Sequence, residues 1–525
     1  MISQQPLIRS ENQLVVGCLL LLIFSFFYQL GIYPLFLEEP RRGLIALEMI
    51  FQDNLWVPTQ TGDLYFRKPP VYNWVLIASY KFFGGYTEFA TRFFSVFSHL
   101  LLSLITFLFT RKYLGHLTAV FVAMSLLVAA DILVYFSTLG EIDLFYALIT
   151  AIPIFATYHY GEKGAYWKLF LVVYLFTAIG FLTKGLTSLP YAAITLLVYF
   201  IHKRQFKALL KVPHFAGIGL FAIIVGGYFY MYSQYQDVGS WWTTLFAESA
   251  DKATNGGLVK WLGHLVSFPL DTIKNILPAG LLIPVLFRKD ILKVLKKDPV
   301  VWYAVLVFVF NFLVYWFSTE AKSRYIYPLF PFLIIPLVYV AFQSSVMLWK
   351  KVLKIMALVF VGLFALVPLV GFFPGQLAVV TNLNLILSIV LILVLMLGYM
   401  FLSKHVRPYL VIIAVMAILK FGFSCILPVT RVLNTGAAED RSLGYEIAEL
   451  TQDQPLYRYG DLRMSLTIVF YIEATREEVL YQKSEYEPGF YFCYARDFPK
   501  NMDYVQHSEF SYSGEPVFLI EIKKP

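Results

Sequence analysis

Apolar runs of about 20 residues recur along most of this chain, and they constrain its fold more than any other feature. Because each helical residue adds about 1.5 Å, about 20 of them cross the hydrocarbon core of a bilayer. By this length criterion we count about thirteen such segments between Leu14 and Val429. Charged residues make up only 14% of the chain, against about 25% in soluble domains. The sequence therefore predicts an all-α polytopic membrane protein with about 13 transmembrane helices.

Several of these segments are near the lower length limit for a span. Among them are Leu169–Thr183, Leu186–Ile201 and Ile273–Phe287. The first run, Leu14–Tyr33, lacks the small-residue cleavage site of a signal peptide, so we expect it to remain as a span.

Charge divides the connecting loops into two alternating sets. Loops such as 111–116, 202–211 and 288–299 are almost purely basic, which is typical of the cytoplasmic side. The other set holds nearly all the acids outside the C-terminal tail and should face the periplasm. The same bias explains the net charge of +8, so we expect no nucleic-acid partner. The sequence predicts a bacterial inner-membrane protein with a cytoplasmic N-terminus and a periplasmic C-terminus.

The tail differs from the rest of the chain. From residue 431 to 525 charges become frequent and apolar runs shorten, which indicates a small periplasmic α/β domain after a transmembrane domain of residues 1–430. Residues 438–452 have the pattern of an amphipathic helix. Strands are predicted for 465–472, 477–482, 489–495 and 516–524. Two larger outer loops are predicted within the transmembrane domain, at 34–87 and 233–272.

Neither cysteines nor histidines give a clear metal or disulfide pattern. Cys18, Cys425 and Cys493 lack the spacing of either kind of site. His264, in the large outer loop, is a candidate metal ligand or substrate contact, although a lone interfacial histidine is more often structural. We expect no cofactor, and a divalent metal is left open.

Acids cluster at the membrane edge of the outer loops. Glu38 and Glu39 directly follow the first span, and Glu141 and Asp143 occupy a very short connection between two later spans. Ionisable groups at that depth are costly and usually face a protein cavity. A single such acid could merely mark the water boundary, but two acidic loops on one side favour a functional site.

Cations accompany these acids on the side where positive charge is normally scarce. They are Lys68, Lys184, Lys322 and Arg324. Each alone is more often an interfacial snorkelling residue than a ligand. Together they favour a phosphate at the membrane surface, as in a lipid-linked phosphosugar, because Lys and Arg stabilise phosphate charge.

The segment Asp63–Trp74, "DLYFRKPPVYNW", concentrates these features. Pro69 and Pro70 stiffen the backbone, so that Lys68 should be held in one direction. The aromatic side chains are typical of an interfacial belt, but they could also stack on a sugar ring or a prenyl chain. They are Tyr65, Phe66, Tyr72 and Trp74.

The outer loop 37–97 carries a recognisable series of residues. It reads Glu38-Glu39-Pro40-Arg41, then Met49, Trp56 and Pro58, Gly62 and Tyr65, Lys68-Pro69-Pro70 and Trp74, and finally Glu88 and Arg92. This series resembles the bacterial lipid A aminoarabinose transferases and the related protein O-mannosyltransferase-like enzymes of the GT-C fold. "LTKGL" (182–186) and "KSRYIYPLFP" (322–331) also resemble landmarks of that superfamily.

The resemblance implies an integral-membrane glycosyltransferase with a polyprenyl-phosphate (undecaprenyl-phosphate) sugar donor. It places the two functional acids at Glu38 and Asp143. Residues expected to bind the donor phosphate are Lys68, Arg324, Tyr325, Lys184, Lys322 and Arg42. Residues expected to line the substrate are Glu39, Arg41, Tyr65, Tyr72, Trp74 and Glu141. Arg67 stands where the lipid A enzymes carry a glutamate of a proposed metal site.

The expected chemistry is attack of an acceptor oxygen on the anomeric carbon of the sugar, with the polyprenyl phosphate as leaving group. If the acceptor is a hydroxyl, Glu38 or Asp143 can take its proton. If it is already ionised, the acids orient groups instead. The acceptor could be lipid A, another glycolipid, a glycan or a protein. The alternative function is a multi-span transporter or flippase of a lipid-linked or anionic substrate.

Overall fold

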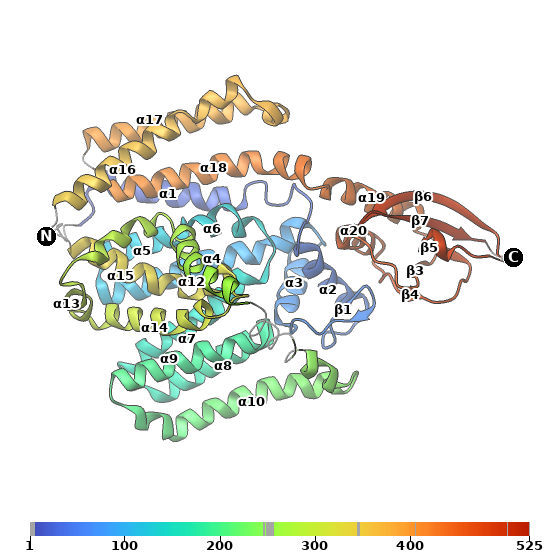
Figure 1. Ribbon diagram of the computed structural model, residues 1–525, viewed down its shortest axis with the longest axis horizontal. Helices are drawn as coiled ribbons and strands as arrows, with labels where there is room; N and C mark the ends of the chain where they lie inside the picture. The colour runs from blue at the N-terminus through green and yellow to red at the C-terminus, as the bar shows by residue number, and fades with distance from the viewer. Residues whose placement is uncertain are drawn as a thin grey trace. The chain divides into compact units, whose positions relative to one another are not determined.

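The computed structural model describes residues 6–244, 247, 257–343, 347–404, 406–500 and 502–523, and these residues form two compact units (Figure 1). The first unit comprises Met1–Leu30, Ser95–Gly227 and Trp242–Thr430. The second comprises Gly31–Phe94, Tyr228–Trp241 and Arg431–Pro525. The long outer loop after the first span therefore folds together with the C-terminal tail.

The first unit is built from long apolar helices. Its main helices are α1 (Arg9–Phe27), α4 (Glu88–Leu114), α5 (His116–Leu127), α6 (Ala130–Val134), α7 (Ile142–Gly161), α8 (Tyr166–Lys184), α9 (Ser188–His202), α10 (Val212–Ser233), α12 (Leu258–Asn275), α13 (Ile291–Lys296), α14 (Pro299–Trp316), α15 (Phe330–Gln343), α16 (Met347–Ala365), α17 (Leu383–Ser403) and α18 (Pro408–Asn434). Short 3-10 turns join several of them, including η1 (Phe136–Thr138), η2 (Gly185–Thr187), η4 (Ala279–Phe287) and η5 (Ser323–Leu329). α4, α10 and α18 each continue into the second unit.

Local sequence explains where α14 begins. Asp298 caps α14, since its side chain accepts hydrogen bonds from the backbone N–H groups of Val300 at 2.9 Å and Val301 at 3.3 Å. Pro299 follows at the first helical position, where a missing N–H costs nothing.

The helical stretches confirm the all-α membrane architecture. In the described part of the chain, ten are long and apolar enough to cross a membrane, or eleven if the bent pair His116–Leu127 and Ala130–Thr138 is one span. One of the ten, Tyr166–His202, folds back on itself at Gly185, whose φ is 75°, so that the rings of Phe170 and Phe200 stack with centroids 5.7 Å apart. The two short spans predicted here are thus a helical hairpin.

The expected segment Ile273–Phe287 is not one helix. α12 ends at Asn275 and the 3-10 turn η4 begins at Ala279. Pro278 and Pro284 lack the backbone N–H that a continuous α-helix needs, so the apolar run breaks there. Part of the predicted outer loop 233–272, namely 245–246 and 248–256, lies outside the described residues.

The second unit combines two helices from the outer loop with a small α/β fold. The outer loop contributes α2 (Glu39–Phe51), the hairpin strands β1 (Thr59–Gln60) and β2 (Asp63–Leu64), and α3 (Val71–Phe83). The tail contributes α19 (Ala437–Leu450), β3 (Leu456–Tyr459), α20 (Leu466–Arg476), β4 (Gln482–Lys483), β5 (Gly489–Tyr494), β6 (Tyr504–Tyr512) and β7 (Glu515–Ile522). The sheet order is β4-β3-β5-β7-β6, with β3 parallel to both of its neighbours and the remaining pairs antiparallel (Figure 1).

The tail confirms some of the predicted elements and corrects others. The amphipathic helix and the strands at 489–495 and 516–524 are present as α19, β5 and β7. The prediction of a strand at 465–472 is wrong, because these residues form most of α20. Its β-branched and aromatic residues adopt a helix here because tertiary packing buries every side chain from Thr467 to Glu473. The strand predicted at 477–482 is also wrong for most of its length, because Glu477 is the left-handed C-cap of α20 and only Gln482 belongs to a strand, β4.

Close packing joins the outer-loop helices to the tail within the second unit. α2 packs against α20, and a Cβ added at Gly43 would lie 2.5 Å from the Phe470 ring. The Tyr471 hydroxyl accepts a hydrogen bond from the backbone N–H of Leu35 at 3.0 Å and donates to Glu88 at 2.9 Å. The outer loop and the C-terminal domain therefore share one core.

Candidate active site

A buried ion pair is the centre of the polar cluster in the first unit. The ammonium of Lys184 lies 2.6 Å from a carboxylate oxygen of Asp143, and the two side chains are 8% and 2% exposed. Asp143 lies in the first turn of α7, and Lys184 is the last residue of α8. Each charge therefore has the sign that its helix end favours.

Arg324 joins this pair from the 3-10 turn η5. One of its terminal nitrogens is 3.4 Å from Glu141, and its Nε is 3.7 Å from Asp143. The Arg324 side chain is 23% exposed, which makes it the most accessible member of the group. Two acids and two cations thus meet at the ends of helices that are otherwise apolar.

Aromatic rings surround the Lys184 ammonium. The ring of Tyr325 lies 4.5 Å from it and the ring of Tyr146 lies 5.0 Å from it. The Tyr146 hydroxyl is within 3.1 Å of Thr187, and the Tyr191 hydroxyl donates to the Tyr325 carbonyl at 2.6 Å. These contacts fix the position of the ammonium without neutralising it.

Four residues proposed from the sequence are thus brought together with Asp143, namely Glu141, Lys184, Arg324 and Tyr325. Lys322 differs from them, because its side chain is exposed, two residues before Arg324.

The second unit holds a separate group of charges at the start of α2. Glu38, at the N-cap of this helix, has a side chain 38% exposed, and its carboxylate lies 2.5 Å from Arg41 and 3.9 Å from Arg42. Arg42 also donates to the Tyr65 hydroxyl at 3.2 Å, and both of these residues are buried. Tyr65 is thereby held by the helix that carries Glu38.

Lys68 lies in a short link, residues 65–69, between two ordered elements. The hairpin β1–β2 precedes it, and Pro70 is the N-cap residue of α3 after it. Its ammonium is 3.0 Å from the Arg67 carbonyl oxygen, and its side chain is partly exposed. The stiff segment expected from the two prolines is therefore anchored at both ends.

Two of the expected substrate-lining residues are almost completely buried. Glu39 has no exposed surface and Tyr72 is 1% exposed. Trp74 is partly exposed, and its indole N–H donates to the Leu55 carbonyl at 2.7 Å.

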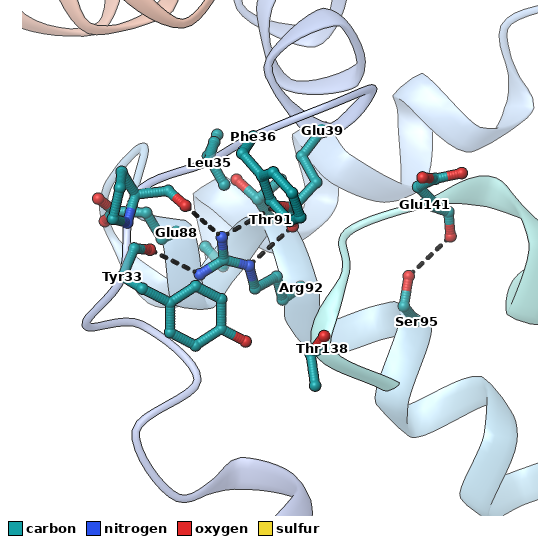
Figure 2. Close-up of polar contacts among 12 residues, drawn as sticks. Tyr33, Leu35, Phe36, Glu39, Glu88, Thr91, Arg92, Ser95, Thr138 and Glu141 are labelled. Carbon is teal, nitrogen blue, oxygen red and sulfur yellow. Dashed lines mark hydrogen bonds and ion pairs between the residues drawn. The ribbon is translucent and has the colours of Figure 1, made fainter. Parts of the chain in front are cut away.

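Figure 2 shows the contacts that hold Glu39. Its carboxylate pairs with the guanidinium of Arg92 through contacts of 2.7 and 2.9 Å, and Arg92 also donates to the carbonyls of Tyr33 and Pro34, each at 2.8 Å. Both charged side chains are completely buried. The Glu39–Arg92 pair therefore holds the start of the outer loop against α4.

His264 makes a structural contact. Its Nε2 is 3.2 Å from the Tyr315 carbonyl oxygen, and its ring lies 4.8 Å from the Phe268 ring. Within the described ranges, no three His, Cys, Asp or Glu side chains are grouped as a metal site would require.

Two polar features of the first unit were missed by sequence reasoning. The Tyr327 hydroxyl donates to Asp131, and Lys420 is 1% exposed with its ammonium 3.0 Å from the Ser137 hydroxyl. A lysine in the apolar run of α18 is a visible signal, because charges inside a span are rare. Nothing in the sequence indicates the partner that each would find.

Comparison with known proteins gives a sequence match for part of the chain. Residues 67–228 match the family described as dolichyl-phosphate-mannose-protein mannosyltransferase. This range contains Lys68, Asp143 and Lys184.

Individual relatives show limited similarity. The undecaprenyl phosphate-alpha-4-amino-4-deoxy-L-arabinose arabinosyl transferase 1 of Sodalis glossinidius is 31% identical over 194 residues, which are 36% of this chain and 34% of that protein. A transferase of the same description from Shewanella sediminis is 25% identical over 400 residues, 70% of this chain and 67% of that protein. An uncharacterised protein of Aquifex aeolicus is 22% identical over 211 residues, 40% of this chain and 42% of its own length. The chain thus spans less than half of the Sodalis and Aquifex proteins.

The structural likeness extends much further than the sequence likeness. The crystal structure of ArnT from Cupriavidus metallidurans bound to undecaprenyl phosphate superposes with a TM-score of 0.71 at 20% identity, covering 97% of this chain and 98% of that one. The apo structure of the same protein gives the same TM-score at 17% identity. The chain therefore has the GT-C fold of ArnT, with its membrane helices and its C-terminal domain, and resembles the aminoarabinose transferases in sequence over part of its length.

Proposed function

We propose that this protein is an integral-membrane glycosyltransferase that takes a sugar from a polyprenyl-phosphate donor. The observation that carries the proposal is the meeting of Lys184 and Arg324 with Asp143 and Glu141 at the ends of membrane helices, in a chain with the ArnT fold. The protein of that fold was crystallised with undecaprenyl phosphate. A carrier-lipid phosphate is therefore the ligand class we propose.

The charges of the first unit suit the leaving group of this reaction. As the bond between the anomeric carbon and the phosphate oxygen breaks, negative charge grows on the polyprenyl phosphate. Arg324, the more exposed cation, would donate to the phosphate oxygens, and Lys184 would add positive charge beside it. The acids hold both cations in place when no phosphate is bound.

The second unit would supply Lys68 as a further cation and Glu38 as the acid that accepts a proton. A general base must reach the proton it removes. Glu38 is 38% exposed, whereas Asp143 is 2% exposed and has Lys184 at 2.6 Å from one of its oxygens. We therefore assign the orienting role to Asp143. When the acceptor is a hydroxyl, the acceptor oxygen bonds to the anomeric carbon and the polyprenyl phosphate leaves. The hydroxyl proton passes to Glu38 in the same step.

The acceptor and the membrane placement belong to the proposal as well. A glycolipid such as lipid A, a glycan or a protein fits this chemistry, because each offers an oxygen nucleophile. The basic loops predict that the N-terminus is cytoplasmic and that the second unit faces the periplasm. A bacterial inner membrane is the location consistent with both.

Transfer from a radiolabelled undecaprenyl-phosphate sugar to envelope lipids or proteins tests the proposal. We expect Arg324→Met and Asp143→Asn each to lower transfer by at least about 100-fold. The first removes a cation that stabilises the leaving group, and the second removes the carboxylate that orients Lys184 and Arg324. Lys274→Ala is the matched control, since this lysine is 68% exposed and forms an ion pair with Asp271.

Two outcomes would contradict this proposal. If Arg324→Met transfers sugar at the wild-type rate while remaining folded in the membrane, the cation cluster has no role in transfer. If purified protein moves a lipid-linked sugar across vesicles without forming a glycosylated product, the protein is a transporter and the proposed activity is wrong.

A further inference from the structure

A tight turn precedes the Lys68 link, and buried charges hold it. Thr61 and Gly62 form this turn between β1 and β2, and both have left-handed backbones with φ of 56° and 80°. The carboxylate of Glu48, on α2, accepts hydrogen bonds from the N–H groups of both turn residues, that of Gly62 at 3.0 Å. Glu48 has no exposed surface. A carboxylate thus fixes the N–H side of the turn.

The C-terminal domain reaches the other side of the same turn. Arg458, on β3, donates to the Thr61 carbonyl at 2.7 Å and lies 3.4 Å from Asp63. Its other terminal nitrogen donates to the Leu462 carbonyl at 3.1 Å, and its side chain is 8% exposed. A Cβ added at Gly62 would lie 2.8 Å from the Tyr481 ring. The turn is therefore enclosed by residues of the tail.

A third buried ionisable group completes this cluster. Glu473, on α20, has no exposed surface, and its carboxylate accepts a hydrogen bond from the Leu480 N–H at 2.9 Å. The charges of Glu48 and Arg458 both act on it. Removing three ionisable groups from water is costly, and Arg458 is the cation that offsets the two acids. This compensation exists only where the tail and the outer loop are folded together.

The fixed turn is linked to Lys68 by a short, hydrogen-bonded path. Thr59 pairs with Leu64 in the hairpin, and the next residue, Tyr65, donates its N–H to the Pro58 carbonyl at 2.9 Å. Two residues separate Tyr65 from Lys68. Little freedom remains between the turn and the lysine.

We propose that Arg458 is a positioning residue, through which the C-terminal domain holds the Lys68 link by clamping the Thr61–Gly62 turn against Glu48. The C-terminal domain then helps to set the geometry of the donor site. The consequence for catalysis rests on the proposed function, because it requires Lys68 to contact the donor phosphate. The clamp itself does not depend on any activity.

Two measurements on the full-length protein in detergent test the clamp and its consequence separately. Hydrogen–deuterium exchange reports the turn directly. We expect Arg458→Met to accelerate exchange at Thr61 and Gly62 at least about 10-fold. We expect Arg458→Lys to fall in between, because an ammonium lacks the forked donors of a guanidinium. Arg463→Met is the matched control, since Arg463 is exposed, five residues away.

Steady-state transfer with labelled undecaprenyl-phosphate sugar reports the consequence. We expect Arg458→Met to raise the KM for the donor about 10-fold or more with a smaller change in kcat, because a mobile Lys68 weakens donor binding. Loss of packing alone would lower the amount of active protein and leave KM unchanged. If Arg458→Met unfolds the sheet, seen as faster exchange throughout β5 and β7, the same comparison is made with Arg458→Lys.

Each result decides one part of the inference. Wild-type exchange at Thr61 and Gly62 in both Arg458 variants would overturn the clamp. Faster exchange with an unchanged donor KM would overturn the link to Lys68. A wild-type protein that transfers no sugar from polyprenyl phosphates would refute the proposed function while leaving the exchange result standing.

Discussion

Removal of the Arg92 guanidinium should destabilise the second unit strongly. Arg92 has no exposed surface, and it donates two hydrogen bonds to Glu39 and one each to the Tyr33 and Pro34 carbonyls (Figure 2). Arg92→Met keeps most of the side-chain volume but removes every donor. The carboxylate of Glu39 is then left buried without its cation.

The size of the effect follows from this geometry. Breaking a buried ion pair by removal of one partner costs about 3–5 kcal/mol, because the remaining charge stays desolvated. The two carbonyls that lose their donor contribute to the same loss and are not added separately, since effects within one network are not additive. At about 2–4 °C per kcal/mol for a unit of this size, the unfolding midpoint should fall by roughly 6–20 °C.

Thiol reactivity offers an assay specific to the second unit. Cys493 is fully buried in β5, and Cys18 and Cys425 are buried in the first unit. In a Cys18→Ala, Cys425→Ala background, a thiol-reactive dye reports only the opening of the C-terminal sheet during heating. Arg496→Met is the control, because the Arg496 side chain is 60% exposed.

A double variant tests the reason for the effect as well as its size. Glu39→Leu combined with Arg92→Met removes both charges, and it should recover at least half of the lost midpoint, since no charge remains buried. A midpoint within 2 °C of the parent for Arg92→Met alone would refute the reasoning on the buried pair.

Three further predictions concern the same unit. Gly43→Ala should destabilise it by about 1–3 kcal/mol, since a Cβ there would lie 2.5 Å from Phe470; Phe470→Leu should restore the loss, as measured by the Cys493 assay. Tyr471→Phe should cost about 1–3 kcal/mol, because the Leu35 N–H loses its acceptor and Glu88 loses a donor; an unchanged midpoint would contradict this. Burial raises the pKa of Glu48 from 4.5 to about 7, although hydrogen bonds from Thr59, Gly62 and Thr61 and the charge of Arg458 act to lower it. Burial and the charge of Glu48 also raise the pKa of Glu473. A raised carboxyl pKa means that the folded state holds its proton more tightly. The contribution of Glu48 to stability should therefore be greatest below pH 4.5 and fall by about 3 kcal/mol as the pH rises to 7, and Glu48→Gln should remove this part of the pH dependence measured by circular dichroism.

Much of the first unit could be predicted from the sequence, but helix ends near proline and glycine could not. The hydropathy of the runs gives the spans, because a bilayer requires continuous apolar helices. Where a run contains Pro278 and Pro284, the same hydropathy predicts a span that the backbone cannot form. In the tail, the composition of 465–472 predicts a strand, whereas packing against α2 makes it a helix.

The candidate site divides in the same way. Loop charge is enough to single out Asp143, Lys184 and Arg324, because ionisable groups at a membrane edge are rare. The sequence cannot distinguish Glu38 from Glu39, two adjacent acids of the same loop. The structure exposes the first and buries the second against Arg92, 53 residues later.

The sequence by itself determined that this chain is a bundle of membrane helices with charged connecting loops, since hydropathy and charge are properties of each local segment. Only the tertiary structure decided which charges are structural and which remain accessible. It also decided that Arg458 in the tail meets a turn of the outer loop 397 residues away. The free-energy cost of a buried charge depends on the partner that folding brings to it. The sequence around the charge does not identify that partner.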